Sequence, residues 1–429
     1  MAAGERERRA RAERLRMAVR GLAVDVSPLR ASRDFRRIWL GMLVSELGYQ
    51  FALVATYVQV TELTGQPAAV GAIGLFGFVA LVIGTIVGGT FVDAYDRRTI
   101  LIFSQMGYMV GSGALLAGAL HGHPPVAVVY GAVALIAAVS AIDLPTRSAM
   151  TPRLVTREHL PSALALTQVV WNGTALLGPA LAGVVIARLG LAWAYAIDVV
   201  TYVAMLAAAI SIGRLPPDRT TRTTGGLAAV REGLAYLRGR RVLQSTFAID
   251  IVAMVFGMPR ALFPILVVTQ FGRGAGVVGL LFAAPAVGAV VGALTTGWVG
   301  RVRHQGRAVI WAVVVWGAGI AAFGLVGDNL WLALFLLAVA GAADVISAVF
   351  RNVILQLSVP DSLRGRLSGF HILVVTGGPR LGDLEAGLVA QAFTPTVSVV
   401  SGGLLCMAGA GVLAWLVPAF RRYHAGEAA

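Results

Sequence analysis

The chain has 429 residues, of which 57% are hydrophobic and only 13% charged, and its mean hydropathy is +0.79. A soluble domain carries about 25% charged residues, so this composition excludes an ordinary soluble protein and indicates a membrane protein. The net charge of +14 comes from arginines that sit in alternate loops, a placement that argues against a nucleic-acid partner.

Residues 1–34 carry many arginines and are predicted to form a basic cytoplasmic tail. Twelve apolar segments follow, each about as long as the roughly 20 residues that a helix needs to cross the hydrocarbon core. They lie near 35–62, 68–92, 98–120, 125–146, 162–187, 190–212, 242–269, 275–299, 306–327, 330–357, 366–392 and 397–419. Backbone polar groups must be satisfied internally in lipid, so the sequence predicts an all-α membrane protein with twelve transmembrane helices.

The segments divide into two sets of six, predicted to form an N-terminal bundle over 35–212 and a C-terminal bundle over 242–420. A cytoplasmic linker at 213–241 joins them, and a helical stripe of apolar residues within it predicts an amphipathic helix on the membrane surface. Residues 421–429 are predicted to be a second cytoplasmic tail.

Arginines mark the orientation of the chain. The N-terminal tail, the linker, the C-terminus and every second connection are Arg-bearing, whereas the opposite set of connections contains only Arg188 and Arg273. Excess positive charge marks the cytoplasmic side, so both termini are predicted to be cytoplasmic. That placement requires an even number of crossings, which twelve satisfies.

The two halves repeat each other. When the sequence is shifted by 204 positions, Glu46 falls on Asp250, Arg97 on Arg301 and Arg147 on Arg351. A duplicated apolar protein is typical of two bundles related by an axis along the membrane normal, with a binding site between them. The sequence therefore predicts a carrier with pseudo-symmetric halves.

Two local motifs stand out in the first half. Gly89, Asp93, Arg97 and Arg98 join the second and third segments, where the acid suits a helix N-terminus and the arginines suit the inner lipid surface. In the fifth segment, Gly178 and Pro179 precede further small residues, a combination that bends a helix and lets a facing helix approach closely. A plain positively charged turn and a purely structural kink are the alternative interpretations.

A third and longer signature runs from Pro145-Thr146-Arg147 to Leu160-Pro161-Ser162-Ala163, with a related stretch in the second half around 341–387. With the two shorter motifs, it resembles the enterobactin-exporter-type branch of the major facilitator superfamily, which contains siderophore exporters and proteins described as multidrug efflux pumps. The resemblance covers residues 33–423. It implies that the 89–98 motif gates the cytoplasmic side and that the Gly-Pro motif seals the pathway and favours antiport.

Charged side chains at membrane depth cost on the order of 3 kcal/mol each, so their presence calls for a partner, a wet cavity or a function. Glu46 and Asp250 each lie ten residues after an arginine at the inner surface. At about 1.5 Å per residue, they sit roughly 15 Å deep, near the midplane. Desolvated carboxylates exchange protons more readily near neutral pH, so these two are the predicted proton-coupling residues. An acid satisfied by a neighbouring hydroxyl or arginine is the alternative.

The other intramembrane polar residues are assigned to the substrate cavity or to pairing at the inner gate. The cavity candidates are Arg260, Arg380, Asp383, Tyr49 and Trp171. Arg380 and Asp383 are three apart and can instead neutralise each other. The gate candidates are Asp143, Arg147, Asp344 and Arg351, with Asp143 and Arg147 interpreted mainly as a structural pair.

We expect a secondary transporter of the bacterial inner membrane that exports an amphipathic organic compound, a siderophore or a drug-like molecule, in exchange for protons. Its expected partners are the small-molecule substrate, protons and the lipid bilayer, and we expect a monomer. A proton-coupled uptake symporter and a non-transporting membrane sensor or scaffold are the alternatives. No nucleotide-binding loop, metal-ligand cluster or catalytic set is found in the sequence, so no enzyme activity, metal or cofactor is expected.

Overall fold

The computed structural model describes residues 25–216, 235–359 and 361–424, without the side chains at 89–93 and 361–373. Most of the predicted basic tail and of the amphipathic linker helix lies outside the described residues, as does the side chain of Asp93. The helices, in chain order, are α2 (Ser27–Ala31), α3 (Arg33–Thr64), α4 (Pro67–Ala94), α5 (Arg97–His121), α6 (Val126–Leu154), α7 (Leu160–Leu189), α8 (Leu191–Ile210), α10 (Arg241–Phe256), the 3-10 helix η1 (Arg260–Leu262), α11 (Phe263–Thr269), α12 (Ala275–Leu294), the 3-10 helix η2 (Thr296–Arg301), α13 (Gln305–Leu325), α14 (Leu330–Ser358), α15 (Asp361–Ala392), α16 (Pro395–Leu416) and α17 (Pro418–Arg421).

Within the described residues, eleven helical stretches are long and apolar enough to cross a membrane, with α10 to α11 counted as one. The predicted eleventh segment corresponds to α15, which has 32 residues but carries Arg380, Asp383 and Glu385 within one span's length. These charges lower its hydropathy, although it packs in the interior against α4 and α10. The expected all-α membrane fold is confirmed, and the predicted count of twelve is close to the eleven apolar spans of the described residues, with α15 as the further, charge-bearing long helix.

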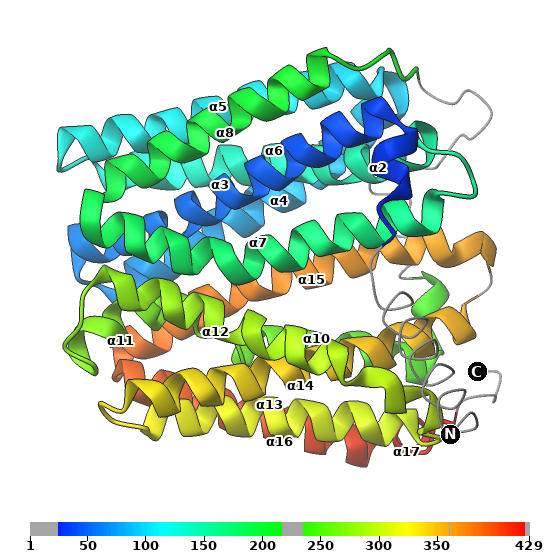
Figure 1. Ribbon diagram of the computed structural model, residues 1–429. Coiled ribbons are helices and arrows are strands. Elements are labelled where there is room, and N and C mark those ends of the chain that lie inside the picture. Colours follow the sequence, from blue (N-terminus) through cyan, green and yellow to red (C-terminus); the bar gives the residue numbers. More distant parts are fainter. Residues whose placement is uncertain (1–24, 217–234, 360, 425–429) are drawn as a thin grey trace, which may run out of the picture.

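The helices form two bundles of six. In the first bundle α3 packs against α7 and α8, α4 against α6, and α5 against α6 and α8. In the second, α12 packs against α14, α13 against α14 and α16, and α10 against α15 and α16. Figure 1 shows α2 and α17 at the same end of the two bundles, as an even number of passes requires. We call this end the tail end and the opposite end the far end.

The bundles touch mainly through two helix pairs, α4 with α15 and α7 with α12. Small residues permit the approach: a Cβ added at Gly71 would lie 2.6 Å from the carbonyl oxygen of Asp383, and one at Gly183 would lie 2.8 Å from that of Gly276. These positions lie in the halves of the helices nearer the far end. Nearer the tail end, Gly84 and Gly292 instead face helices of their own bundles. The bundles are therefore closed against each other at the far end.

The predicted seventh segment, 242–269, is one span but not one continuous helix. The structure breaks it between α10 and η1, at Gly257–Pro259. Proline lacks an N–H and cannot continue a helix without losing a hydrogen bond. The carbonyl oxygen of Gly257 freed at the break accepts a hydrogen bond from the indole of Trp316 at 2.9 Å. The break therefore lies buried inside the bundle with its backbone group satisfied.

Candidate functional site

A central cavity of about 440 Å³ lies between the two bundles. Its wall combines α3, α4, α5, α6 and α7 of the first bundle with the broken seventh segment, α12, α13, α14 and α15 of the second. The lining is mostly apolar and aromatic, with a few polar groups, which is typical of a site for an organic ligand. Its aromatic and arginine side chains include Tyr49, Tyr57, Phe263, Phe282, Trp316, Arg260 and Arg380.

Three of the predicted cavity residues line this space: Tyr49, Arg260 and Arg380. Asp383 lies directly behind the wall, where it is fully buried and bonded to Arg260. Trp171 does not belong to the lining and lies with the polar network of the first bundle. Its carbonyl oxygen accepts the Thr174 hydroxyl at 3.3 Å.

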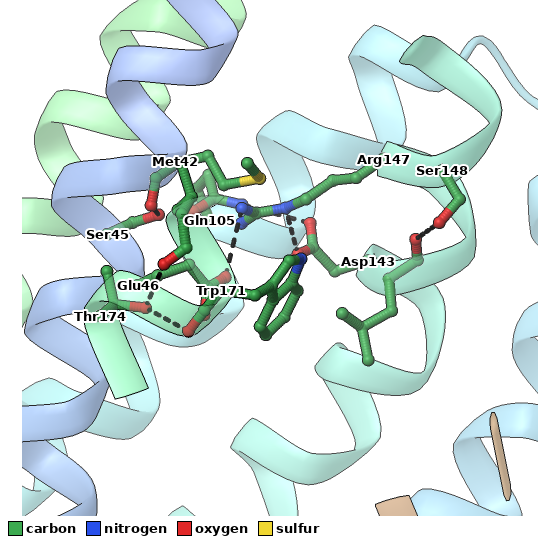
Figure 2. A network of polar contacts seen from close by, with 11 residues as sticks. Met42, Ser45, Glu46, Gln105, Asp143, Arg147, Ser148, Trp171 and Thr174 are labelled. Atoms are coloured by element: carbon green, nitrogen blue, oxygen red, sulfur yellow. Dashed lines mark hydrogen bonds and ion pairs between the residues drawn. The ribbon is translucent and has the colours of Figure 1, made fainter. Parts of the chain in front are cut away.

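The buried ion pairs of the described residues form three clusters, and the first lies within the first bundle. Arg147 stands between two carboxylates, with Nε 2.6 Å from Asp143 and Nη1 3.5 Å from Glu46. The amide of Gln105 donates to the other oxygen of Asp143 at 3.3 Å. Figure 2 shows the side chains from α3, α5 and α6 converging on the guanidinium. The arginine thus contacts acids from two helices, Glu46 of α3 and Asp143 of α6.

The second cluster lies at the equivalent place in the second bundle. Arg351 Nη2 lies 2.8 Å from Asp250, and its Nη1 donates to the Ser347 hydroxyl at 2.9 Å. Both charged side chains are nearly inaccessible, with 3% and 1% exposed. The carboxyl of Asp344 has one buried oxygen without a hydrogen-bond partner, and this residue lines the cavity.

The two clusters obey the internal repeat. Glu46 and Arg147 of the first pair match Asp250 and Arg351 of the second at the same shift of 204 positions. Each pair joins the first helix of its bundle to the fourth. Neither predicted proton-coupling acid lines the cavity in this conformation, because each is held by an arginine of its own bundle.

The third cluster connects the bundles at the far end. The Tyr57 hydroxyl of α3 donates to Asp383 Oδ2 of α15 at 2.5 Å. Arg260 Nη2 lies 3.2 Å from the same oxygen, and the backbone N–H of Ala261 donates to Oδ1 at 3.2 Å. Three donors from two segments, α3 and η1, therefore converge on one carboxylate that water does not reach.

Arg380 does not neutralise Asp383, although the two lie one turn apart on α15. Its Nη1 donates instead to the carbonyl oxygen of Gly77 on α4 at 2.6 Å. No carboxylate within ion-pair distance of Arg380 is found among the described residues. The cavity wall therefore carries a guanidinium whose charge the described part of the protein does not pair.

The arginines of the 89–98 motif contact their own bundle at the tail end. Arg98 donates to the carbonyl oxygens of Ala209 and Ile210 at 3.2 and 2.7 Å, where α8 ends. Arg97 reaches the Pro216 carbonyl at 3.0 Å. Arginine near a helix C-terminus satisfies carbonyls that have no partner within the helix. These contacts fix α5 to the end of α8.

The Gly-Pro motif lies where α7 meets both α3 and the cavity. A Cβ added at Gly178 would lie 2.5 Å from Cβ of Gln50, and Pro179 lines the cavity. The helix α7 continues through Pro179 without a break. The glycine therefore permits a close helix crossing, and the neighbouring proline contributes to the cavity wall.

Sequence reasoning missed two parts of this arrangement. It did not connect Tyr57 with Asp383, because no local pattern joins residues so far apart in the chain. It also assigned no partner to Asp198, whose Oδ2 accepts the Ser112 hydroxyl of α5 at 2.5 Å. The Gly257 and Pro259 positions, in contrast, were a readable signal for the broken seventh segment.

Two six-helix bundles around a central cavity with buried, paired charges define a membrane transporter of the major facilitator class. The chain belongs to the transmembrane secretion effector family, whose model matches residues 23–425. The enterobactin exporter EntS of Citrobacter koseri is 28% identical over 409 residues, which cover 94% of this chain and 96% of that protein. The corresponding exporter of Salmonella typhi is 26% identical over 394 residues, which cover 90% of this chain and 93% of that protein.

Solved structures share the fold. A bacterial homologue of the iron transporter ferroportin in an inward-facing state aligns with a TM-score of 0.68, 15% identity and coverage of 91% of this chain and 98% of that one. A POT family transporter in complex with 5-aminolevulinic acid aligns with a TM-score of 0.68 and 11% identity. That alignment covers 91% of this chain and 97% of the transporter. The predicted superfamily, the exporter-type branch and the membrane-spanning architecture are thereby confirmed.

Proposed function

We propose that this protein exports an amphipathic organic compound across the bacterial inner membrane in exchange for protons. The observation that carries the proposal is the mostly apolar cavity, which is walled by both bundles and contains two arginines and several aromatic side chains. A cavity at the interface of two repeated halves is the usual binding site of an alternating-access carrier. The relatives named as enterobactin exporters favour export of a siderophore-like compound.

The orientation follows from the arginines. The tail end carries the Arg-bearing turns, so it is assigned to the cytoplasm, with both termini inside. The inter-bundle crossings near Gly71 and Gly183 then close the outer side of the cavity. This conformation corresponds to an inward-facing carrier, ready to take substrate from the cytoplasm.

Glu46 and Asp250 remain the proposed proton-coupling residues. Each carboxylate is held by an arginine, Arg147 or Arg351, that belongs to the fourth helix of the same bundle. A proton on the acid removes the attraction and lets the arginine move. Proton binding from the outside would thereby change how the first and fourth helices of a bundle pack, which links the protonation state to the conformation of that bundle.

The test is transport in proteoliposomes with an imposed pH gradient, with enterobactin, ethidium and an arene sulfonate as probes. Glu46→Gln and Asp250→Asn are expected to abolish gradient-driven transport while leaving downhill movement of the probe. Asp34→Asn, at an exposed position of the same helix as Glu46, is the matched control and is expected to behave as wild type.

Unchanged gradient coupling in both variants would refute the proton assignment and leave the carrier fold intact. Probe that accumulates with the proton flow, instead of against it, would establish the uptake symporter. Binding of a probe without movement under any gradient would favour the sensor or scaffold.

A further inference from the structure

The buried charges of this protein differ in what they join. The pairs Glu46–Arg147 and Asp250–Arg351 each lie within one bundle. Asp383, in contrast, accepts hydrogen bonds from donors in both bundles. A contact within a bundle survives rigid-body rocking of the two halves. A contact between bundles at the closed end does not, and the Tyr57–Asp383 hydrogen bond must break when the far end opens.

The buried carboxylate of Asp383 is stabilised by its hydrogen-bond donors. Its carboxylate is fully inaccessible to water and receives Tyr57, Arg260 and the amide of Ala261. Removing one partner from a buried ion pair strongly destabilises the arrangement, because the remaining charge is left uncompensated in a low dielectric. Loss of Arg260 would thus weaken the closed far end through Asp383.

Arg260 is the donor that a ligand can reach. Its side chain is 24% exposed, against 0% for Asp383, and it lines the cavity. The helix break that precedes it places it on the wall, and its Nε is a buried donor without a hydrogen-bond partner. An anionic group in the cavity would therefore find an arginine with hydrogen-bonding capacity to spare.

Arg380 supplies a second cation on the same wall. It lies on α15, one turn before Asp383, and its only described hydrogen bond goes to the neutral Gly77 carbonyl. Arginine stays charged in proteins, and it binds carboxylate, sulfonate or phosphate oxygens through two parallel N–H groups. A substrate anion would neutralise a charge that the described residues leave unpaired.

We propose that the cavity selects substrates with an anionic oxygen group, which Arg380 and Arg260 bind, and that capture of Arg260 by this group frees Asp383 and releases the far end. Substrate recognition and opening of the outer side are then one exchange of partners: Arg260 passes from the carboxylate of Asp383 to the anionic group of the substrate. The inference rests on the proposed transport function and adds to it a substrate class and a trigger.

Charge selectivity is tested with two probes that differ only in a sulfonate, 8-anilinonaphthalene-1-sulfonate and neutral N-phenyl-1-naphthylamine. Binding and transport of both are measured on the full chain in proteoliposomes. Arg380→Gln is expected to weaken binding of the sulfonate probe about tenfold, which is the loss typical of one charge-assisted hydrogen bond. The affinity for the neutral probe is expected to change by less than about twofold. Arg380→Lys should recover part of the loss.

Release of the far end is followed separately, by reaction of Ile73→Cys with a membrane-impermeant maleimide added from the far side. Ile73 lines the cavity and is 5% exposed, and Cys406 is replaced by serine in this background. The sulfonate probe is expected to accelerate labelling several-fold, whereas the neutral probe should not. Asp383→Asn should raise labelling without any probe. Glu385→Gln, two residues away on α15, is the matched control and should not.

Should Asp383→Asn fail to fold, Tyr57→Phe removes the Tyr57–Asp383 hydrogen bond alone and must still raise labelling. Transport that proceeds with equal preference for both probes, before and after Arg380→Gln, would overturn the inference and leave the transport function standing. Labelling that responds to the sulfonate without any transport would support the switch and refute the transport function. Labelling unaffected by the sulfonate would overturn the switch.

Discussion

Arg351→Gln is expected to destabilise the second bundle strongly, and the structure sets the size of the effect. The substitution leaves Asp250, whose side chain is 1% exposed, without the guanidinium that lies 2.8 Å away. Breaking a buried ion pair by removing one partner costs about 3–5 kcal/mol. The double variant Asp250→Asn/Arg351→Gln removes both charges and is expected to recover at least about 2 kcal/mol of this loss.

The free energy of unfolding is measured in sodium dodecyl sulfate, with reaction of a maleimide dye at Cys406 as the signal. This single cysteine is fully buried, so it reacts only as its surroundings open. Asp34→Asn is the control: its pair with Arg37 is 40% and 48% exposed, and an exposed pair contributes about 0–1 kcal/mol. A single Arg351 variant within about 1 kcal/mol of wild type, or a double variant no more stable than the single one, would refute the reasoning.

Three further predictions concern helix contacts. Gly279→Val would place a side chain into the carbonyl of Pro179 at the crossing of α7 and α12, so we expect a far end that no longer closes, measured as faster far-side maleimide labelling; unchanged labelling would contradict it. The added side chain of Gly178→Val would overlap Gln50, so we expect a loss of about 1–3 kcal/mol in the free energy of unfolding and a proton leak in vesicles. Normal efflux without a leak would remove the sealing role. Arg98→Gln removes two hydrogen bonds to the end of α8, and we expect a loss of about 1–2 kcal/mol in the unfolding assay with transport retained. Abolished transport would instead support the gating role predicted from the sequence.

Much of the fold was readable because it depends on coarse physical patterns. Segment length, apolar composition and the alternation of arginines predict twelve passes with both ends on one side, and the described ends do lie at the same end of the bundles. The exceptions are local. Pro259 interrupts the seventh segment, and the charges of α15 reduce its hydropathy while tertiary packing keeps it helical.

The candidate site was readable only in part. The repeat aligned Glu46 with Asp250 and Arg147 with Arg351. In the structure, the acid and the arginine of each half form an ion pair. The shift of 204 positions indicates this equivalence, because residues at equivalent positions in duplicated bundles contact equivalent neighbours. The link from Tyr57 to Asp383 obeys no repeat, since it joins the bundles to each other.

The spacing of Arg380 and Asp383 was compatible with a pair on one helix face, yet the two side chains take different partners. Sequence spacing places two residues near each other but does not decide which of several neighbours wins. Here the Arg260 guanidinium and the Ala261 amide reach Asp383 because the broken seventh segment brings them there. Trp171 was predicted to line the cavity but does not, for a similar reason: its place depends on the rotation of α7 against α3.

The account rests most directly on rocking of the two bundles about the central cavity. Spin labels at Gln66 and Arg273 report the separation of the bundles at the far end, and labels at Glu158 and Arg303 report it at the tail end; all four positions are exposed. When substrate and a pH gradient are added to the full chain in liposomes, the far-end distance is expected to grow while the tail-end distance shrinks. Distances that stay fixed at both ends, or that change in the same direction, would contradict the account.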